Sequence, residues 1–237
     1  MPILSVDALD ARHGLLQAVR GISLAVEEGE TLALVGANGA GKTTLLRCIA
    51  GAHRASAGRV TFDGADVTHL PAHRRVQRGI ALVPEGRRLF AGMTVEENLR
   101  VAAGRGRAGT WTVERIVAAF PQLGPKLHAR AGDLSGGQQQ AAAIARALMT
   151  HPRLLLLDEV SLGLSPIAVD AVYASLQGLL GGGATVVLVE QDLARALRVA
   201  DRVVCMLEGR VVYEGRARET TREQVMAAYF GLREAAA

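Results

Sequence analysis

The chain has 237 residues, of which 49% are hydrophobic, 3% are aromatic and 21% are charged, and its formal net charge is +4. This length and aliphatic content predict one large α/β domain and exclude an intrinsically disordered protein. The two cysteines have no metal-ligand spacing, and no charged apolar leader opens the sequence, so we expect a protein of the reducing cytoplasm. No apolar run approaches the roughly 20 residues that a membrane-spanning helix needs.

Short β-like runs alternate with turns and helical patterns along most of the chain. The expected strands cover residues 3–6, 22–26, 31–35, 59–62, 80–83, 154–157, 185–189 and 203–207. The expected helices cover residues 42–50, 94–102, 112–119, 136–149, 168–179 and 193–199. Strands that alternate with helices predict a mostly parallel sheet with both faces covered, and the strand-free stretch 91–150 is expected to be an inserted helical subdomain.

Positive charge is concentrated in one segment. Residues 73–107 carry eight arginines against three glutamates, an excess of five charges that is larger than the net charge of the whole chain. The arginines are Arg74, Arg75, Arg78, Arg87, Arg88, Arg100, Arg105 and Arg107. Such a segment is either a solvated face or a surface for an acidic partner.

The sequence of residues 36–44, GANGAGKTT, fits the P-loop pattern G-x-x-x-x-G-K-[ST] between an apolar run and a helix. In such a loop, backbone N–H groups and the helix N-terminus bind phosphate oxygens, a lysine reaches the β and γ phosphates, and a hydroxyl ligates Mg²⁺. We therefore expect ATP and Mg²⁺ as ligands. The predicted phosphate-binding residues are Gly36, Asn38, Gly39, Ala40, Gly41, Lys42, Thr43 and Thr44.

A run of four leucines at 154–157 precedes Asp158 and Glu159. A buried strand would carry both acids to its carboxyl end, where open α/β sheets bind ligands. We expect Asp158 to hold Mg²⁺, directly or through water, and Glu159 to act as the general base on the attacking water.

Residues 134–138, LSGGQ, stand between these two motifs and open a helix. Taken alone, they are typical of a serine-capped helix. After a P-loop and before Leu-Leu-Asp-Glu, they resemble the signature motif of ATP-binding-cassette (ABC) ATPases. In that family the signature of one subunit closes on the γ phosphate held by another subunit. The resemblance therefore implies a second cassette and adds Ser135, Gly136, Gly137 and Gln138 to the nucleotide-binding residues.

The resemblance covers essentially the whole chain. It implies an α/β fold, namely a P-loop NTPase (RecA-like) core with an antiparallel β subdomain and an inserted α-helical subdomain. In this interpretation residues 1–237 form a single ABC ATPase domain. Residues 1–90 and 151–237 are its nucleotide-binding core, and residues 91–150 are the helical subdomain that carries the signature.

Further site residues follow from the resemblance, position by position. His13 stands where the family has an aromatic residue that stacks on adenine. Glu85 replaces a glutamine that senses Mg²⁺ and faces the membrane partner, and its carboxylate can still ligate the ion. Gln191 replaces the switch histidine, and it can hydrogen-bond a γ-phosphate oxygen or water but cannot carry a proton. The predicted catalytic residues are Glu159, Gln191 and Lys42, and the predicted Mg²⁺ ligands are Thr43, Glu85 and Asp158.

The departures from the general family pattern are themselves informative. The segments PEGRR at 84–88, LGL at 162–164 and VEQ at 189–191 resemble the shorter ATPase of branched-chain amino acid importers. This resemblance implies an ATPase at the cytoplasmic face of the membrane. Its expected partners are two permeases, a second ABC ATPase in a heterodimer or a homodimer, and, indirectly, an extracytoplasmic solute-binding protein.

Three alternatives remain. Close relatives of that subunit serve importers of urea or other amides. A soluble ABC ATPase acting on DNA or ribosomes would use the arginine-rich segment, but scarce aromatic residues offer few stacking platforms for nucleic acid, and we expect no nucleic-acid partner. A P-loop kinase for small molecules would not need the signature motif. We expect the arginine-rich segment to lie where membrane subunits dock.

Overall fold

The computed structural model describes residues 1–180 and 182–230. The chain forms two compact units, which we call the first and the second unit. The first unit comprises Met1–Pro71 and the described residues from Thr185 onward, and the second comprises Ala72–Ala184. The subdomain boundaries expected at residues 90 and 150 stay a prediction.

An antiparallel sheet forms one part of the first unit. Its strand order is β2-β1-β4-β5. The strands are β1 (Leu4–His13), β2 (Leu16–Val26), β4 (Ala57–Phe62) and β5 (Ala65–Asp66). The first two strands are longer than their apolar runs, and register shifts interrupt their pairing after Val6. The expected antiparallel β subdomain is confirmed.

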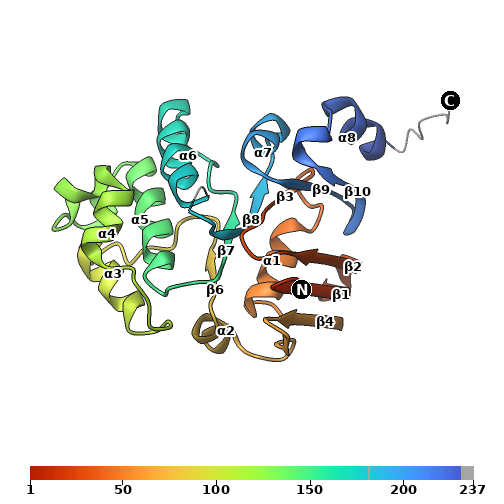
Figure 1. Cartoon of the computed structure of the whole chain (residues 1–237), viewed down its shortest axis with the longest axis horizontal. Helices are drawn as coiled ribbons and strands as arrows, with labels where there is room; N and C mark the ends of the chain where they lie inside the picture. The colour runs from red at the N-terminus through yellow and green to blue at the C-terminus, as the bar shows by residue number, and fades with distance from the viewer. Residues whose placement is uncertain (181, 231–237) are drawn as a thin grey trace. The chain divides into compact units, whose positions relative to one another are not determined.

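The other part of the first unit is built around β3. The strand order there is β10-β9-β3-β8, with β3 (Thr31–Val35), β8 (Thr185–Glu190), β9 (Arg202–Leu207) and β10 (Arg210–Arg216). Strand β3 runs parallel to both of its neighbours (Figure 1), and all five of its residues are buried. The helices of this unit are α1 (Lys42–Ala50), α7 (Leu193–Val199) and α8 (Arg222–Tyr229), with the 3₁₀ turn η3 (Ala217–Glu219).

The second unit pairs β6 (Ile80–Val83) with β7 (Leu154–Asp158) in parallel. Its helices are α2 (Ala72–Arg78), α3 (Val95–Ala103), α4 (Val113–Ala119), α5 (Gly136–Leu148) and α6 (Pro166–Leu180), with the 3₁₀ turns η1 (Pro121–Lys126) and η2 (Ala131–Asp133). Helix α5 packs against both α3 and α6. Reciprocal capping boxes open α3, at Thr94 and Glu97, and α5, at Ser135 and Gln138, and each satisfies two otherwise unpaired backbone N–H groups.

Two helices were not expected from the sequence. Helix α2 has seven residues and three arginines, and it shows no apolar periodicity. Helix α8 begins at a capping box formed by Thr221 and Gln224, a start signal that is readable in the sequence. Among the described residues, no helix is both long and apolar enough to cross a membrane.

The arginine-rich segment is not one surface. Arg75 on α2 is only 2% exposed, so it cannot bind a docking partner, and the expectation is wrong for this residue. Arg100 is ion-paired with Glu96 one helical turn away. Arg87 is half-buried, whereas its neighbour Arg88 is exposed. The excess charge is therefore divided between the protein interior, a helix surface and an exposed loop.

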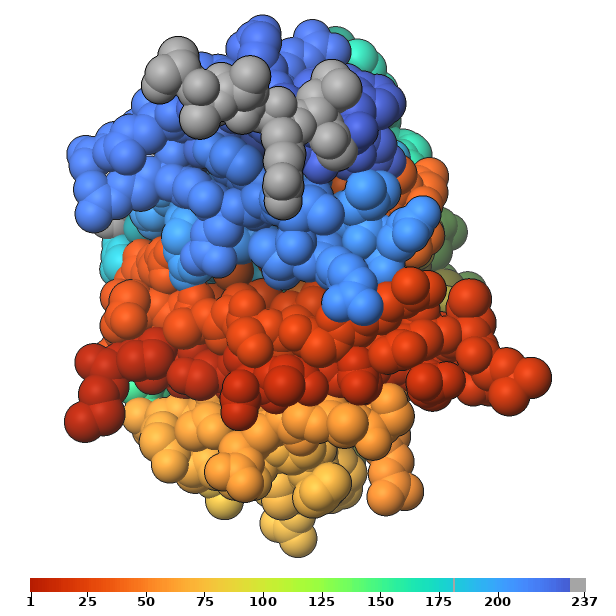
Figure 2. All heavy atoms as spheres, turned by 90° about the vertical axis from the view of Figure 1, so that its right-hand side faces the viewer, coloured from red at the N-terminus to blue at the C-terminus, as the bar shows by residue number. Residues whose placement is uncertain are grey.

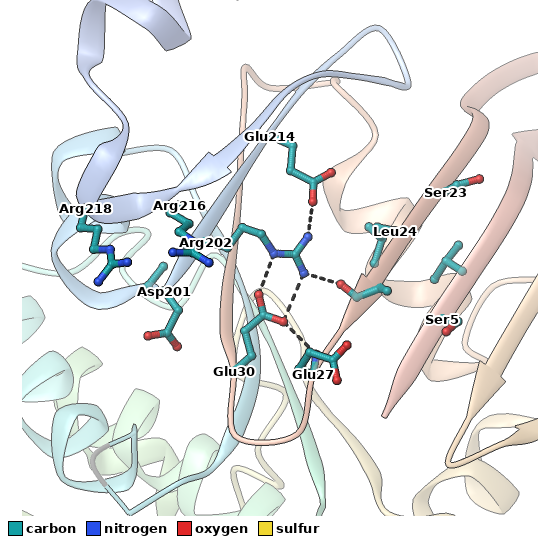
Figure 3. Close-up of a pocket in the computed structure, with 13 residues that line it drawn as sticks. Ser5, Ser23, Leu24, Glu27, Glu30, Asp201, Arg202, Glu214, Arg216 and Arg218 are labelled. Carbon is teal, nitrogen blue, oxygen red and sulfur yellow. Dashed lines mark hydrogen bonds and ion pairs between the residues drawn. The ribbon is translucent and has the colours of Figure 1, made fainter. Parts of the chain in front are cut away.

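Arg202 at the start of β9 joins three segments of the first unit. Its guanidinium donates to Glu30 (Nε to Oε1, 2.7 Å), to Glu214 on β10 and to the carbonyl of Ala25 on β2. Figure 3 shows these groups converging at one side of a pocket of about 890 Å³. In Figure 2 the amino-terminal strands lie directly against the carboxyl-terminal segment that contains β9 and β10.

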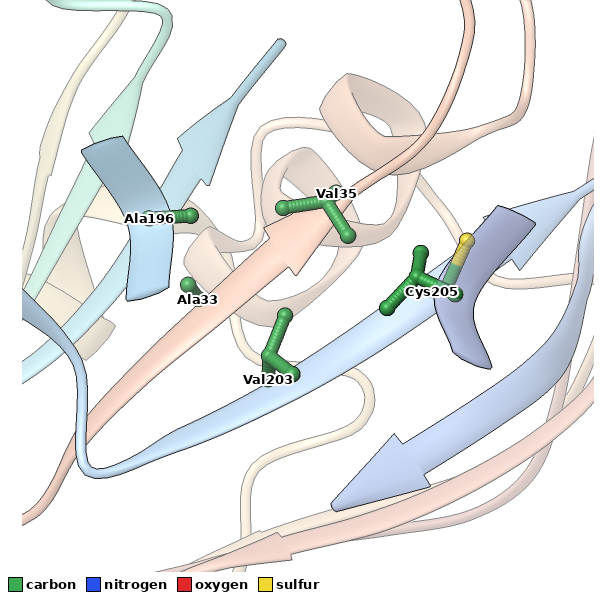
Figure 4. Packing of buried hydrophobic residues seen from close by; sticks show 6 residues of the cluster. Ala33, Val35, Ala196, Val203 and Cys205 are labelled. Atoms are coloured by element: carbon green, nitrogen blue, oxygen red, sulfur yellow. The ribbon is translucent and has the colours of Figure 1, made fainter. Parts of the chain in front are cut away.

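A small apolar cluster packs α7 and α8 onto the parallel strands. It contains Ala33 and Val35 on β3, Val203 and Cys205 on β9, and Ala196 on α7 (Figure 4), together with Val225 on α8. Burial raises the pKa of the Cys205 thiol to about 11, although the nearby Lys42 ammonium acts in the opposite direction. The thiol is therefore protonated and poorly nucleophilic at neutral pH.

Replacing Arg202 should destabilise the first unit. We expect Arg202→Met to lower the free energy of unfolding by about 1–3 kcal/mol, because Glu30, whose side chain is 12% exposed, would lose its cation. The matched control is Arg59→Met. Arg59 pairs with Asp66 in the same unit, but the two side chains are 67% and 54% exposed, so we expect a loss of no more than about 0.5 kcal/mol. If urea denaturation shows that both variants lose the same free energy of unfolding, a structural role for the Arg202 network is contradicted.

The protonated Cys205 thiol should make stability depend on alkaline pH. The thiol ionises more readily in the unfolded chain, near its reference pKa of 9.0, than in the folded chain, near 11. Its contribution is therefore complete below pH 9 and is lost as the pH rises to 11, up to a limit of about 3 kcal/mol. The difference in unfolding free energy between wild type and Cys205→Ala should shrink over this range. If this difference in unfolding free energy does not change with pH, the raised pKa of Cys205 is contradicted.

Candidate functional site

The P-loop leaves the carboxyl end of β3 and passes very close to neighbouring backbone. A Cβ atom on Gly36 would lie 2.3 Å from the carbonyl oxygen of Met206 on β9, and one on Gly41 would lie 2.2 Å from that of Ala18 on β2. Both glycines also have positive φ, 146° and 98°. Only glycine satisfies both conditions, so the two glycines fix the path of the loop for steric reasons.

Lys42 begins helix α1 inside this loop and is only 4% exposed. Its Nζ donates to the carbonyl oxygens of Gly36 and Ala37, each at 2.8 Å. The first turn of α1 contains no acidic residue, and its N-cap Gly41 makes no side-chain cap. The helix N-terminus therefore presents backbone N–H groups and a buried cation, which are the donors that nucleotide phosphates require. Thr43 supplies the hydroxyl next to Lys42.

His13, at the end of β1, lies next to the last P-loop residue. Its Nε2 is 3.1 Å from the Thr44 hydroxyl, and its ring centroid is 4.5 Å from that of His53, with a tilt of 41°. His53 belongs to no motif, so no local sequence signal points to it. The contact with Thr44 places the imidazole of His13 at the P-loop, and its role toward adenine stays a prediction.

Gln191 directly follows β8 and belongs to the same unit as the P-loop. It lines a cavity of about 310 Å³ together with Gly36, Ala37 and Asn38. The other lining residues are mostly apolar and come from β3, α7, β9 and α8: Val35, Leu193, Cys205, Val225, Met226 and Tyr229. The structure thus brings the predicted switch residue and the P-loop to one cavity.

The two predicted acids of the second unit differ in environment. Asp158, the last residue of β7, is 1% exposed, whereas Glu159 is half-buried. Glu159 has a φ of 48°, a left-handed conformation that non-glycine residues rarely adopt and that is concentrated at functional sites. The backbone therefore turns sharply between a buried carboxylate and a more accessible one.

Residues 135–138, which we call the signature turn, pack tightly against their surroundings in the second unit. Ser135 is the N-cap of α5, and its hydroxyl accepts from the N–H of Gln138 at 3.4 Å. A Cβ atom on Gly136 would lie 3.2 Å from both Leu164 and Arg87, and one on Gly137 would lie 2.8 Å from the Cβ of Ala168. The two glycines let the loop at 161–166 and the start of α6 approach the turn closely.

Glu85 lies in the loop that follows β6, and its side chain is exposed. The first unit thus carries the P-loop, His13 and Gln191, and the second carries Glu85, the signature turn, Asp158 and Glu159. Within the described residues, no three His, Cys, Asp or Glu side chains cluster as a metal site. Mg²⁺ bound with a nucleotide usually takes one or two carboxylates beside phosphate oxygens and water, so it does not need such a cluster. The Thr43 hydroxyl and the Asp158 and Glu85 carboxylates, each considered in its own unit, are oxygen ligands of the kind that this ion prefers. The individual roles stay predictions.

The chain is similar to several known proteins over most of its length. The family described as ABC transporter matches residues 19–161. The high-affinity branched-chain amino acid transport ATP-binding protein BraG of Pseudomonas aeruginosa is 41% identical over 97% of this chain and 100% of its own length. The probable branched-chain amino acid transport ATP-binding protein LivF of Archaeoglobus fulgidus is 35% identical over 89% of this chain and 91% of its own length.

A solved structure shows the same fold. The ADP conformation of an ATP-binding cassette of an ABC transporter has a TM-score of 0.80 and 29% identity, with 98% of this chain and 99% of that chain covered. The P-loop geometry, the family match and the fold lead to one conclusion. The chain belongs to the ABC transporter family, and it is an ATP-binding cassette that hydrolyses ATP.

Proposed function

We propose that this chain is the ATP-hydrolysing subunit of an importer for branched-chain amino acids. The observation that carries the proposal is the 41% identity to BraG, which extends over the full length of BraG. A Nod factor export ATP-binding protein of Rhizobium meliloti is 36% identical, but only 65% of its length is covered. An importer of urea or another amide is the alternative solute assignment, since the cassette itself does not bind the solute.

The P-loop would bind ATP through atoms that the folded chain already places. Lys42 would exchange its bonds to the carbonyls of Gly36 and Ala37 for bonds to the β and γ phosphates. Mg²⁺, held by Thr43, Asp158 and Glu85, would neutralise charge on the phosphate oxygens. Glu159 would accept a proton from the attacking water, and Gln191 would orient that water or a γ-phosphate oxygen by hydrogen bonding.

A second cassette would complete the site. The signature turn donates backbone N–H groups at the start of a 13-residue helix, a suitable partner for the γ phosphate bound to the other cassette. Two large apolar side chains are exposed near Leu164 and Ala168, the residues that pack against the turn: Leu162 at 49% and Ile167 at 84%. Their exposure supports a partner surface at this place. ATP would favour the closed dimer and hydrolysis would reopen it, with a second copy or a related cassette as the partner.

Coupling to membrane subunits would use the loop that carries Glu85. Phe90 in this loop is 51% exposed, and such an apolar side chain on an exposed loop suits docking to a membrane protein. Two permeases would receive the motion, and an extracytoplasmic binding protein would deliver the solute. The cassette would act at the cytoplasmic face of the membrane.

The steric role of Gly36 gives a direct test of the P-loop. In Gly36→Ala the new methyl group would meet the Met206 carbonyl, so the loop must move, and we expect ATP affinity to fall by at least ~10-fold, about 1.4 kcal/mol. Gly64→Ala is the control, because Gly64 also has positive φ but has open space around it. Its ATP affinity, measured with a fluorescent nucleotide, should be unchanged. Equal affinities for the two variants would contradict the steric role of Gly36.

Glu159→Gln tests the catalytic assignment and the solute together. We expect the variant to retain ATP binding, to lose at least ~100-fold in hydrolysis rate, and to accumulate as an ATP-bound dimer. In proteoliposomes with the permeases, the related cassette and the binding protein, the wild-type chain should drive ATP-dependent leucine uptake, and Glu159→Gln should not.

Glu114→Gln, an exposed glutamate on α4, is the matched control and should keep parental hydrolysis and uptake. Parental hydrolysis by Glu159→Gln would refute Glu159 as the base. Uptake of urea but not of leucine would favour the amide alternative.

A further inference from the structure

Arg87 and Arg88 are neighbours of the same residue type in the Glu85 loop, yet the structure gives them different surroundings. Both have left-handed backbone conformations, with φ of 64° and 52°. Arg88 is exposed, whereas Arg87 is half-buried and extends toward α5. The two residues have the same type and the same local sequence, so any difference in their function comes from their tertiary contacts.

The guanidinium of Arg87 reaches the signature turn. Its Nη1 donates to Oε1 of Gln139 on α5 at 3.0 Å, and its Nη2 lies 3.2 Å from the position of a Cβ on Gly136. The backbone of Arg87 is held from the same helix, because Arg146 donates to its carbonyl oxygen at 3.4 Å. The Arg146 guanidinium also lies over the ring of Phe90, 5.5 Å from its centroid. The Glu85 loop is thus attached to α5 at three points.

Gln139 extends this contact to the chain segment that enters the signature. Its Nε2 donates to the carbonyl oxygens of Ala131 and Leu134, at 3.3 and 3.2 Å, and also to that of Gly132 at 3.5 Å. If the Gln139 amide were rotated by 180°, its N–H groups would face the N–H groups of the Arg87 guanidinium and its oxygen would face the carbonyl oxygens. Neither arrangement can form a hydrogen bond. Arg87, which has only donors, therefore selects the one amide orientation that also binds the segment before Ser135.

We propose that Arg87 is a positioning residue, which acts through Gln139 to hold the signature turn in the orientation that ATP-driven dimer closure requires. The inference rests on the proposed function. Because Arg87 belongs to the loop of Glu85, it links that loop directly to the first turn of α5, in addition to the backbone hydrogen bonds from Ala131 and Gly132 to Met93 and Ala91. A side-chain contact that forms in one position of the loop and breaks in another would couple the loop to the signature turn.

An arginine is required for this geometry. Its planar fork donates from Nη1 to Gln139, while Nη2 lies 3.2 Å from the position that a Cβ on Gly136 would take. A lysine has one point charge on a flexible stem and cannot make both contacts. A Cβ at position 136 would crowd both the guanidinium and Leu164, each at 3.2 Å, so glycine gives this contact the most room.

The test is ATP-dependent dimer formation in the Glu159→Gln background, measured by analytical ultracentrifugation. We expect Arg87→Ala to weaken the ATP-bound dimer by at least ~10-fold, whereas Arg88→Ala changes it by less than ~2-fold. ATP affinity of the monomer, measured below the dimer dissociation constant, should be the same in both variants, since neither arginine is among the residues predicted to bind the nucleotide within one cassette. Arg87→Lys should fail to restore the dimer, although it retains the charge and gives a second folded variant.

A double-mutant cycle checks the route through Gln139. If Arg87 acts through this residue, Arg87→Ala should add little to the dimer defect of Gln139→Ala. Equal dimerisation of Arg87→Ala and Arg88→Ala, full rescue by lysine, or a parallel loss of monomer ATP affinity would overturn the inference. If the Glu159→Gln parent dimerises with ATP neither by itself nor with the related cassette, the proposed function fails, and the inference fails with it. That result is distinct from a defect confined to Arg87→Ala.

Discussion

The close approach of the P-loop to the backbone of two neighbouring strands is the constraint on which the first unit depends. The carbonyls of Met206 and Ala18 occupy the space where side chains at Gly36 and Gly41 would lie. Because the loop cannot move outward without losing this packing, its N–H groups and Lys42 are held in place before any phosphate binds. Preorganised donors lose little conformational freedom on binding, which favours tight recognition of a highly charged ligand.

In the second unit, glycines again allow close packing, here around the signature turn. Gly136 and Gly137 let Leu164, Ala168 and Arg87 pack against the first turn of α5. The loop after Glu159, the signature turn and the Glu85 loop therefore meet at one helix end. Three segments with separate predicted roles are physically connected there, so a change in one of them alters the contacts of the others.

Much of the fold was predictable because its signals are local. The apolar runs that became β3, β7 and β8 were placed within one residue, since buried parallel strands are nearly continuous in hydrophobic residues. Helix α2 has no apolar face to signal it. The extensions of β1 and β2 mix buried apolar residues such as Leu9 and Val19 with charged and polar ones, and the register shifts after Val6 interrupt the regular alternation that marks a strand. The buried state of Arg75 was likewise unpredictable, because arginine side chains are rarely fully buried and the sequence of α2 has no feature that marks this one as an exception.

The sequence by itself determined the chemistry: the phosphate-binding loop, the two acids after a leucine strand and the signature motif are contiguous patterns in which residue type and spacing suffice. Tertiary structure alone decided which side chains surround them. Gln191 shares a cavity with Gly36, His13 contacts Thr44, and Arg87 binds Gln139 while Arg88 does not. The partners in these pairs lie 31 to 155 residues apart, and Arg87 and Arg88 differ although they are adjacent residues of the same type. Local sequence patterns do not specify packing between distant segments.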